Sequence, residues 1–136
     1  MPDMKKGIML VDDDPEDREV FSDVYLAQFP GEKLYFAENG EKALKLLENI
    51  SDDSEELCLI VLDLNMPILN GTQTLRKLKT DDRFKDIPVV IYSTSVNDTE
   101  REECYRLGAL DYLVKPSTFS DSVEIAKKLK RICALY

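Results

Sequence analysis

The sequence contains no histidine, and this absence excludes several kinds of catalytic and metal-binding site. Serine–histidine catalytic triads, zinc sites with histidine ligands and histidine general bases all need an imidazole ring. A function built on any of them is therefore ruled out.

Cysteine is also scarce, with three widely spaced residues and no C-x-x-C pair: Cys58, Cys104 and Cys133. Each falls at an apolar position of its predicted helix or strand, and an odd, dispersed set is not typical of a disulfide framework. We therefore expect three buried free thiols, in a reducing compartment.

A basic surface and long apolar runs are missing as well. The 136-residue chain has 18 Lys and Arg against 27 Asp and Glu, a formal net charge of −9, whereas a nucleic-acid surface needs clustered basic side chains. No apolar run approaches the length of a membrane span, and the N-terminus lacks the apolar core of a signal peptide. We expect a cytoplasmic protein that binds neither nucleic acid nor membrane, folded as a single domain over residues 1–136.

Short apolar runs that alternate with amphipathic stretches are the main feature that is present. Five predicted strands and five predicted helices alternate along the chain, which indicates a parallel sheet with helices on both faces. Asp14 is expected to cap the first helix, Pro15 to occupy its first position, and Gly108 to end the fourth. The strands are expected at residues 7–11, 33–37, 58–62, 89–92 and 110–114.

The run at residues 58–62 is short, continuous and aliphatic, which is typical of a strand buried on both faces. Asp63 comes directly after it, at the position where ligands and chemistry gather in open parallel sheets. An isolated aspartate after a strand more often caps a turn than takes part in chemistry. The case for Asp63 therefore depends on the residues at the ends of the other strands.

Residues capable of chemistry stand at the ends of four of the five predicted strands, and in a parallel sheet these four positions lie on one edge. Three carboxylates there would repel one another by several kcal/mol, so they would share protons or bind a cation. Oxygen ligands without histidine or cysteine suit a hard cation, and Mg²⁺ better than Ca²⁺. The residues are Asp12 and Asp13, then Asp63, then Ser93 with Thr94, then Lys115.

Lys115 and Ser93 make this set suitable for a phosphoryl group as well as a metal. A lysine, a hydroxyl and a cation together could neutralise three oxygens of a phosphoryl group on Asp63. Carboxylates are established nucleophiles that form acyl phosphates. The four strand ends taken together therefore indicate phosphoryl chemistry on Asp63.

These residues and their surroundings resemble the receiver domain of response regulators, the phospho-acceptor half of two-component signalling. The resemblance extends over about residues 7–133 and implies a flavodoxin-like α/β fold, a doubly wound sheet of five parallel strands in the order 2-1-3-4-5. The matching motifs are Leu-Val-Asp-Asp at 10–13, Leu-Asp-Leu-Asn-Met-Pro at 62–67 with Asn-Gly at 70–71, Ile-Pro-Val-Val-Ile-Tyr-Ser-Thr at 87–94, Gly-Ala at 108–109 and Asp-Tyr-Leu-Val-Lys-Pro at 111–116.

The resemblance implies that Asp63 is the phosphorylated aspartate and that Mg²⁺ is the cofactor. The metal would bind next to Asp63, which would be one of its ligands. Asp13 would bind it directly, Asp12 mostly through water, and Asn65 through its backbone carbonyl.

The resemblance also implies a switch. Ser93 takes the position of the switch serine or threonine that moves with the phosphoryl group, and Tyr112 that of the aromatic residue that swings inward when Ser93 moves. Lys115 would contact a phosphoryl oxygen, next to a cis peptide bond to Pro116.

For the whole protein, the resemblance implies a stand-alone switch with no output domain. Its phosphoryl donor would be a histidine kinase, a histidine phosphotransfer protein or a small phosphodonor. The face from Asn97 to the C-terminus would contact a downstream protein. Because the chemistry would be limited to phosphorylation and hydrolysis of Asp63 itself, we do not expect an enzyme.

Three alternatives compete with this hypothesis. A receiver-like scaffold that works without phosphorylation stays open, because fold alone does not fix activity. A flavin carrier of the same architecture needs an anion-binding loop after the first strand, where the aspartates at 12–14 would repel a flavin phosphate. A haloacid-dehalogenase-like phosphatase needs a second acid two residues after Asp63, where Asn65 stands. The last two alternatives are therefore disfavoured.

Overall fold

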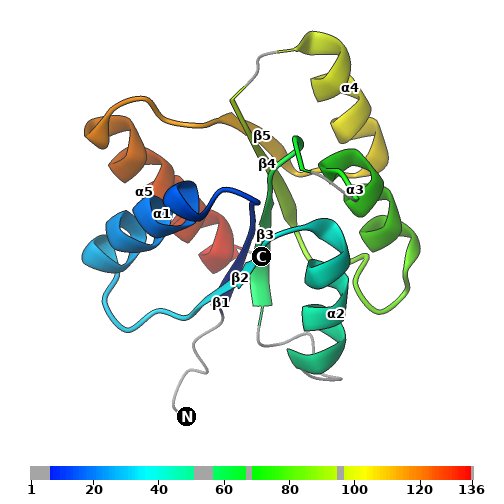
Figure 1. Cartoon of the computed structure of the whole chain (residues 1–136), viewed down its shortest axis with the longest axis horizontal. Helices are drawn as coiled ribbons and strands as arrows, with labels where there is room; N and C mark the ends of the chain where they lie inside the picture. Colours follow the sequence, from blue (N-terminus) through cyan, green and yellow to red (C-terminus); the bar gives the residue numbers. More distant parts are fainter. Residues whose placement is uncertain (1–6, 51–56, 67–68, 95–96, 136) are drawn as a thin grey trace.

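The computed structural model describes residues 7–50, 57–66, 69–94 and 97–135. Strands and helices alternate along these residues, as the sequence predicts (Figure 1). The strands are β1 (Gly7–Val11), β2 (Leu34–Ala37), β3 (Leu57–Leu62), β4 (Val89–Ser93) and β5 (Asp111–Val114). The helices are α1 (Pro15–Gln28), α2 (Gly40–Ile50), α3 (Gly71–Thr80), α4 (Asp98–Leu107) and α5 (Phe119–Leu135).

The five strands form one parallel sheet in the order β2-β1-β3-β4-β5, which confirms the expected fold class. Val11 at the end of β1 pairs with Leu62 at the end of β3, and Leu62 pairs with Ile91 of β4. Ser93 pairs in turn with Val114 of β5. Because the strands are parallel and in this register, the residues at their carboxyl ends emerge at the same edge of the sheet.

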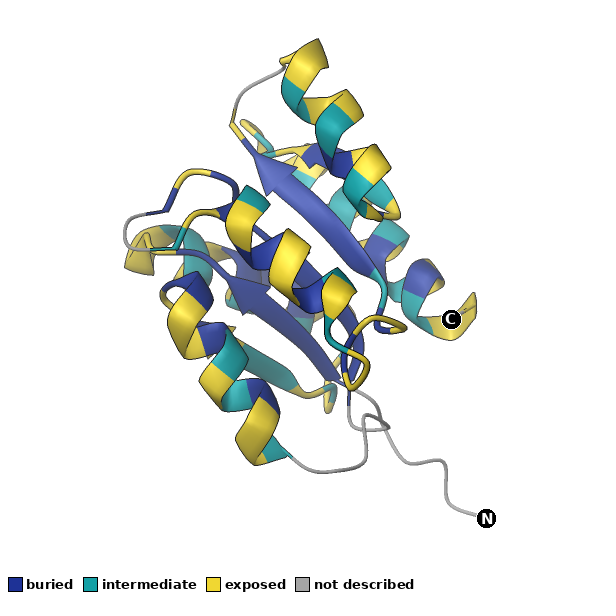
Figure 2. Cartoon of the chain, turned by 90° about the vertical axis from the view of Figure 1, so that its right-hand side faces the viewer, coloured by how far each residue is buried: buried dark blue, intermediate teal, exposed yellow. Residues whose placement is uncertain are grey.

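Helices cover both faces of the sheet, with α1 and α5 on one side and α2, α3 and α4 on the other (Figure 1). Successive side chains of a strand point to opposite faces. Met9 and Val11 therefore join the core beneath α2, α3 and α4, whereas Ile8 and Leu10 join the core beneath α1 and α5. The central strands are buried on both faces, and the outer surfaces of the helices are exposed (Figure 2).

Two of the helices that begin at the edge with the candidate residues, α1 and α3, start at polar caps. Asp14 caps α1 by accepting a hydrogen bond from the Glu16 N–H, and Pro15 occupies the first helical position, as predicted. Asn70 caps α3 in a reciprocal pair of hydrogen bonds with Gln73. These caps fix where α1 and α3 start relative to the ends of β1 and β3.

The structure contradicts the expectation of three free thiols. Cys58 of β3 and Cys133 near the end of α5 form a disulfide, with their Cα atoms 5.1 Å apart. The residues are 75 positions apart in the sequence, so only the packing of α5 on the sheet reveals that they are neighbours. Cys104 is a buried free thiol, as expected, and burial raises its pKa to about 11. The inference of a reducing compartment loses the support that it drew from Cys58 and Cys133.

The predicted strands agree with the structure to within one residue at their ends. The predicted loop at residues 51–56 and the turn proline at residue 67 lie outside the described residues. Among the helices that the structure describes, none has the length and apolarity needed to cross a lipid bilayer.

The disulfide predicts a stability that depends on reductant. Closing a loop of this length limits the freedom of the unfolded chain, so the oxidised protein should resist unfolding by roughly 2–4 kcal/mol more than the reduced protein. Urea unfolding with and without dithiothreitol measures this difference. The variant Cys133→Ser should show no response to the reductant. The prediction is contradicted if the wild type has the same free energy of unfolding, and the same number of free thiols, with and without dithiothreitol.

Candidate functional site

Three aspartates lie together at the carboxyl edge of the sheet. Asp12 and Asp13 come after β1, Asp63 comes after β3, and one carboxylate oxygen from each lies within 4.8 Å of the others. Asp12 is fully buried, Asp63 is only 4% exposed, and Asp13 is exposed. The group therefore combines two buried carboxylates with one that opens to solvent.

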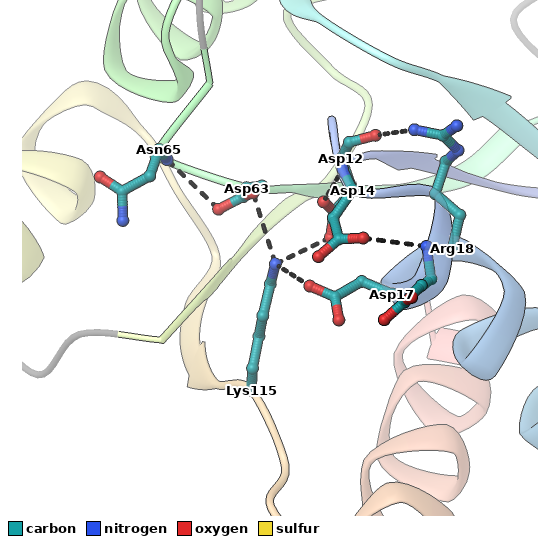
Figure 3. Close-up of polar contacts among 8 residues, drawn as sticks. Asp12, Asp14, Asp17, Arg18, Asp63, Asn65 and Lys115 are labelled. Carbon is teal, nitrogen blue, oxygen red and sulfur yellow. Dashed lines mark hydrogen bonds and ion pairs between the residues drawn. The ribbon is translucent and has the colours of Figure 1, made fainter.

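Backbone hydrogen bonds hold the two buried aspartates in place. The Asp63 N–H donates to the Val11 carbonyl at 2.9 Å, which continues the pairing of β1 and β3 beyond the last paired residues. The Asp14 N–H donates to Asp12 Oδ1 at 3.0 Å, and the Asn65 N–H donates to Asp63 Oδ1 at 3.2 Å (Figure 3). Each carboxylate thus has one oxygen fixed by the turn at the end of its own strand.

Gly71 lets α3 begin against the loop that comes after Asp63. A Cβ atom at this position would lie 2.3 Å from the Asp63 carbonyl oxygen and 2.5 Å from the Leu64 Cα, closer than backbone atoms allow. The Gly71 N–H also donates to the Leu64 carbonyl at 3.0 Å. The close approach of α3 and this loop therefore requires glycine, whereas the sequence pattern places Gly71 only in a turn.

Lys115, which comes after β5, extends its ammonium group into the cluster. Its Nζ lies 2.8 Å from Asp12 Oδ2, 2.9 Å from Asp17 Oδ2 and 3.4 Å from Asp63 Oδ2 (Figure 3). Burial lowers the pKa of Lys115, but the hydrogen bonds and charges of the surrounding carboxylates outweigh it and raise the pKa above its ordinary value. The lysine is therefore a permanent positive charge at this edge.

Asp17 is a member of the site that the sequence does not reveal. Its position in the first turn of α1 is sufficiently explained by the helix dipole. In the structure its carboxylate makes an ion pair with Lys115 Nζ. No signal in the sequence distinguishes it from Glu16, which precedes it in the same acidic turn.

Asp63 has a raised pKa at this site. Burial raises its pKa from 3.8 to about 6, Lys115 and the Asn65 N–H oppose the rise, and the charge of Asp12 adds to it. At neutral pH the group is still mostly ionised, so it is available as a nucleophile or as a metal ligand.

Ser93 and Tyr112 lie on the strands β4 and β5, beyond β3 in the sheet. Ser93 is fully buried at the end of β4, and its carbonyl accepts a hydrogen bond from the Lys115 N–H at 2.8 Å. Tyr112 of β5 is 7% exposed and packs in the core beneath α2, α3 and α4. Tyr112 is therefore a core residue in this structure.

The expected cis peptide bond between Lys115 and Pro116 is wrong, since the described residues contain no cis peptide bond. Lys115 reaches all three carboxylates from a trans bond. The cis form is a minority state even before proline.

The donor set fits a hard divalent cation. Asp12, Asp13 and Asp63 offer only oxygen atoms, and the exposed side of the group at Asp13 gives a cation access from solvent. Three carboxylates in this space carry more negative charge than Lys115 neutralises. The residues present therefore fit Mg²⁺ or Mn²⁺.

Comparisons with known proteins point in one direction. Residues 8–127 match the family described as the response regulator receiver domain. The two-component response regulator ORR5 of Oryza sativa is 33% identical over 125 residues, which cover 91% of this chain and 88% of that protein. The structure of the phosphorylated cyanobacterial phytochrome response regulator RcpA superposes with a TM-score of 0.83 at 27% identity, covering 95% of this chain and 94% of that one.

A second similar structure is the Mn²⁺-bound form of response regulator Rcp1. Its TM-score is 0.79 at 28% identity, and the match covers 92% of this chain and 91% of that one. A divalent metal is thus present in one protein with this fold.

The raised pKa of Asp63 predicts that this residue destabilises the metal-free protein. Between about pH 4 and pH 6 the folded state keeps a proton that the unfolded state has released, so stability falls as the pH rises and the full penalty applies above pH 6. At neutral pH, Asp63→Asn should therefore raise the free energy of unfolding by roughly 1–3 kcal/mol. The gain should shrink towards zero near pH 4.

Urea unfolding in EDTA across this pH range provides the measurement. Asp82→Asn is a matched control, because the Asp82 side chain is 93% exposed. A gain that does not change with pH, or a less stable Asp63→Asn, would contradict the prediction.

Proposed function

Since the chain belongs to the response regulator receiver domain family, we propose that it is a phosphorylation switch that accepts a phosphoryl group on Asp63. The donor is a histidine kinase, a histidine phosphotransfer protein or a small phosphodonor. We further propose that the protein works as a single receiver domain with a core at about residues 7–133. The similarity over most of the length of ORR5 supports this part of the proposal.

The observation that carries the proposal is the position of the Asp63 carboxylate beside two further carboxylates and one ammonium group. Oxygens of Asp12, Asp13 and Asp63 lie within 4.8 Å of one another, and Lys115 Nζ lies 3.4 Å from Asp63 Oδ2. With a pKa of about 6, the Asp63 carboxylate is mostly ionised at neutral pH. In the transfer an oxygen of Asp63 attacks phosphorus, the bond from phosphorus to the donor breaks, and the donor group leaves with the electron pair.

Mg²⁺, when bound, neutralises the charge that the phosphoryl oxygens carry in the transition state. Asp13 would hold it directly, Asp12 mostly through water, and Asp63 and the Asn65 carbonyl would complete the protein ligands. The oxygen-only donor set and the Mn²⁺-bound relative Rcp1 support this assignment. Lys115 would neutralise the charge of a further phosphoryl oxygen, since its ammonium group already lies at this edge of the sheet.

The output of the switch is a change in a protein contact. Ser93 would move with the phosphoryl group, and Tyr112 would respond on the neighbouring strand. The face built from α4, β5 and α5 suits a partner protein, because it exposes Tyr105, Leu110 and Val114 at 36–44% of their surface.

We place the phosphoryl transfer in the cytoplasm, where ATP phosphorylates histidine kinases. No separate substrate is turned over, so the protein is not an enzyme in the usual sense.

The proposal predicts a covalent adduct that depends on metal. Incubation with acetyl phosphate and Mg²⁺ should add the mass of one phosphoryl group to the intact protein, because the ionised Asp63, with Lys115 and a bound Mg²⁺ beside it, can accept it without a kinase. Intact mass spectrometry detects the adduct. It should be absent from Asp63→Asn and from a sample in EDTA.

Asp82→Asn serves as the matched control and should be labelled like the wild type, since its carboxylate lies on the surface. Labelling of Asp63→Asn to the same extent would overturn the assignment. If neither acetyl phosphate nor histidine kinases label the wild type and Mg²⁺ does not bind, the protein is a scaffold that works without phosphorylation.

A further inference from the structure

Asp17 contributes a carboxylate to the site that the phosphorylation scheme does not use. It is the third residue of α1, and its Oδ2 lies 2.9 Å from Lys115 Nζ. Among the described residues, the carboxylates grouped closely enough to hold one metal ion are those of Asp12, Asp13 and Asp63, without Asp17. Its contact is with the lysine.

The Lys115 ammonium is shared unequally among its three acceptors. It lies 2.8 Å from Asp12 and 2.9 Å from Asp17, but 3.4 Å from Asp63 (Figure 3). An ammonium group has three protons to donate, so these contacts occupy all of them. The nitrogen therefore lies closer to Asp12 and Asp17 than to Asp63, the group that would be phosphorylated.

Asp17 is fixed where it makes this contact. The Asp14 cap and Pro15 set the start of α1, and Phe21 and Tyr25 anchor the helix in the core. The Asp17 side chain itself is 42% exposed and lines, with Lys115, a cavity of about 250 Å³ between α1 and α5. A change of its charge should therefore leave the packing of the helix intact.

We propose that Asp17 is a positioning residue that restrains Lys115 and thereby lowers the affinity of the site for a phosphoryl group. The inference rests on the proposed function, because it takes Asp63 as the acceptor. Two effects act in the same direction. Asp17 competes with the phosphoryl oxygens for the lysine, and its own negative charge repels them. Asp17 thus raises the concentration of phosphodonor that is needed to phosphorylate Asp63.

The test uses trifluoroberyllate, a phosphoryl analogue, titrated with Mg²⁺ into the full chain and followed by backbone amide NMR. Asp17→Asn keeps the shape of the side chain and removes its charge. It should bind the analogue about threefold more tightly than the wild type, the size expected for one partly exposed ion pair. Glu16→Gln is the matched control, because it removes a neighbouring charge of the same helical turn that is exposed, and it should bind like the wild type.

A second readout reports on the ion pair itself without any analogue. The ¹⁵N resonance of the Lys115 ammonium should shift in Asp17→Asn and stay in place in Glu16→Gln. A residue that only supported the helix would change neither this resonance nor the affinity for trifluoroberyllate.

The outcomes separate the two proposals. If the wild type binds trifluoroberyllate and Asp17→Asn binds it equally or more weakly, the role of Asp17 is wrong and the proposed function stands. The same holds if Glu16→Gln tightens binding as much as Asp17→Asn, since the effect is then one of general charge. If the wild type binds no trifluoroberyllate with Mg²⁺, the proposed function fails, and the inference on Asp17 fails with it.

Discussion

The repulsion among carboxylates at one edge of the sheet is the constraint on which the site depends. Asp12 and Asp63 are buried side by side with Asp13 at the surface, and burial makes their charges more costly than in water. Lys115 offsets part of this cost, and the raised pKa of Asp63 shows that it does not offset all of it. The remaining negative charge suits the site to a cation.

The fold holds these groups together through strands and helices that pack by apolar contacts. Parallel pairing of β1 with β3 brings the two aspartate-bearing turns side by side, and the apolar residues of these strands are almost completely buried. Gly71 lets α3 pack on the turn after β3, and the Lys115 N–H ties the end of β5 to Ser93. The energy for assembling the site therefore comes from the core, and the site residues are free to serve binding and chemistry.

Much of this architecture could be predicted because it depends on local pattern. Alternating apolar runs and caps predict the parallel sheet, and parallel strands necessarily bring Asp63 and Lys115 to one edge. The role of Asp17 could not be predicted, since its direction depends on how α1 packs against the sheet. The disulfide of Cys58 and Cys133 could not be predicted for the same reason, because no pattern in the sequence indicates that the end of α5 packs on β3. Both misses are contacts between elements far apart in the chain.

A crystal structure with Mg²⁺ and trifluoroberyllate would show whether Asp63 is the phosphoryl acceptor, because it locates both the metal and the phosphoryl analogue. We expect the analogue on the Asp63 carboxylate, with Mg²⁺ among Asp12, Asp13 and Asp63 and the Lys115 ammonium in hydrogen-bond contact with a fluorine atom. An analogue bound to a different side chain, or a saturated crystal in which Asp63 carries none, would contradict this expectation.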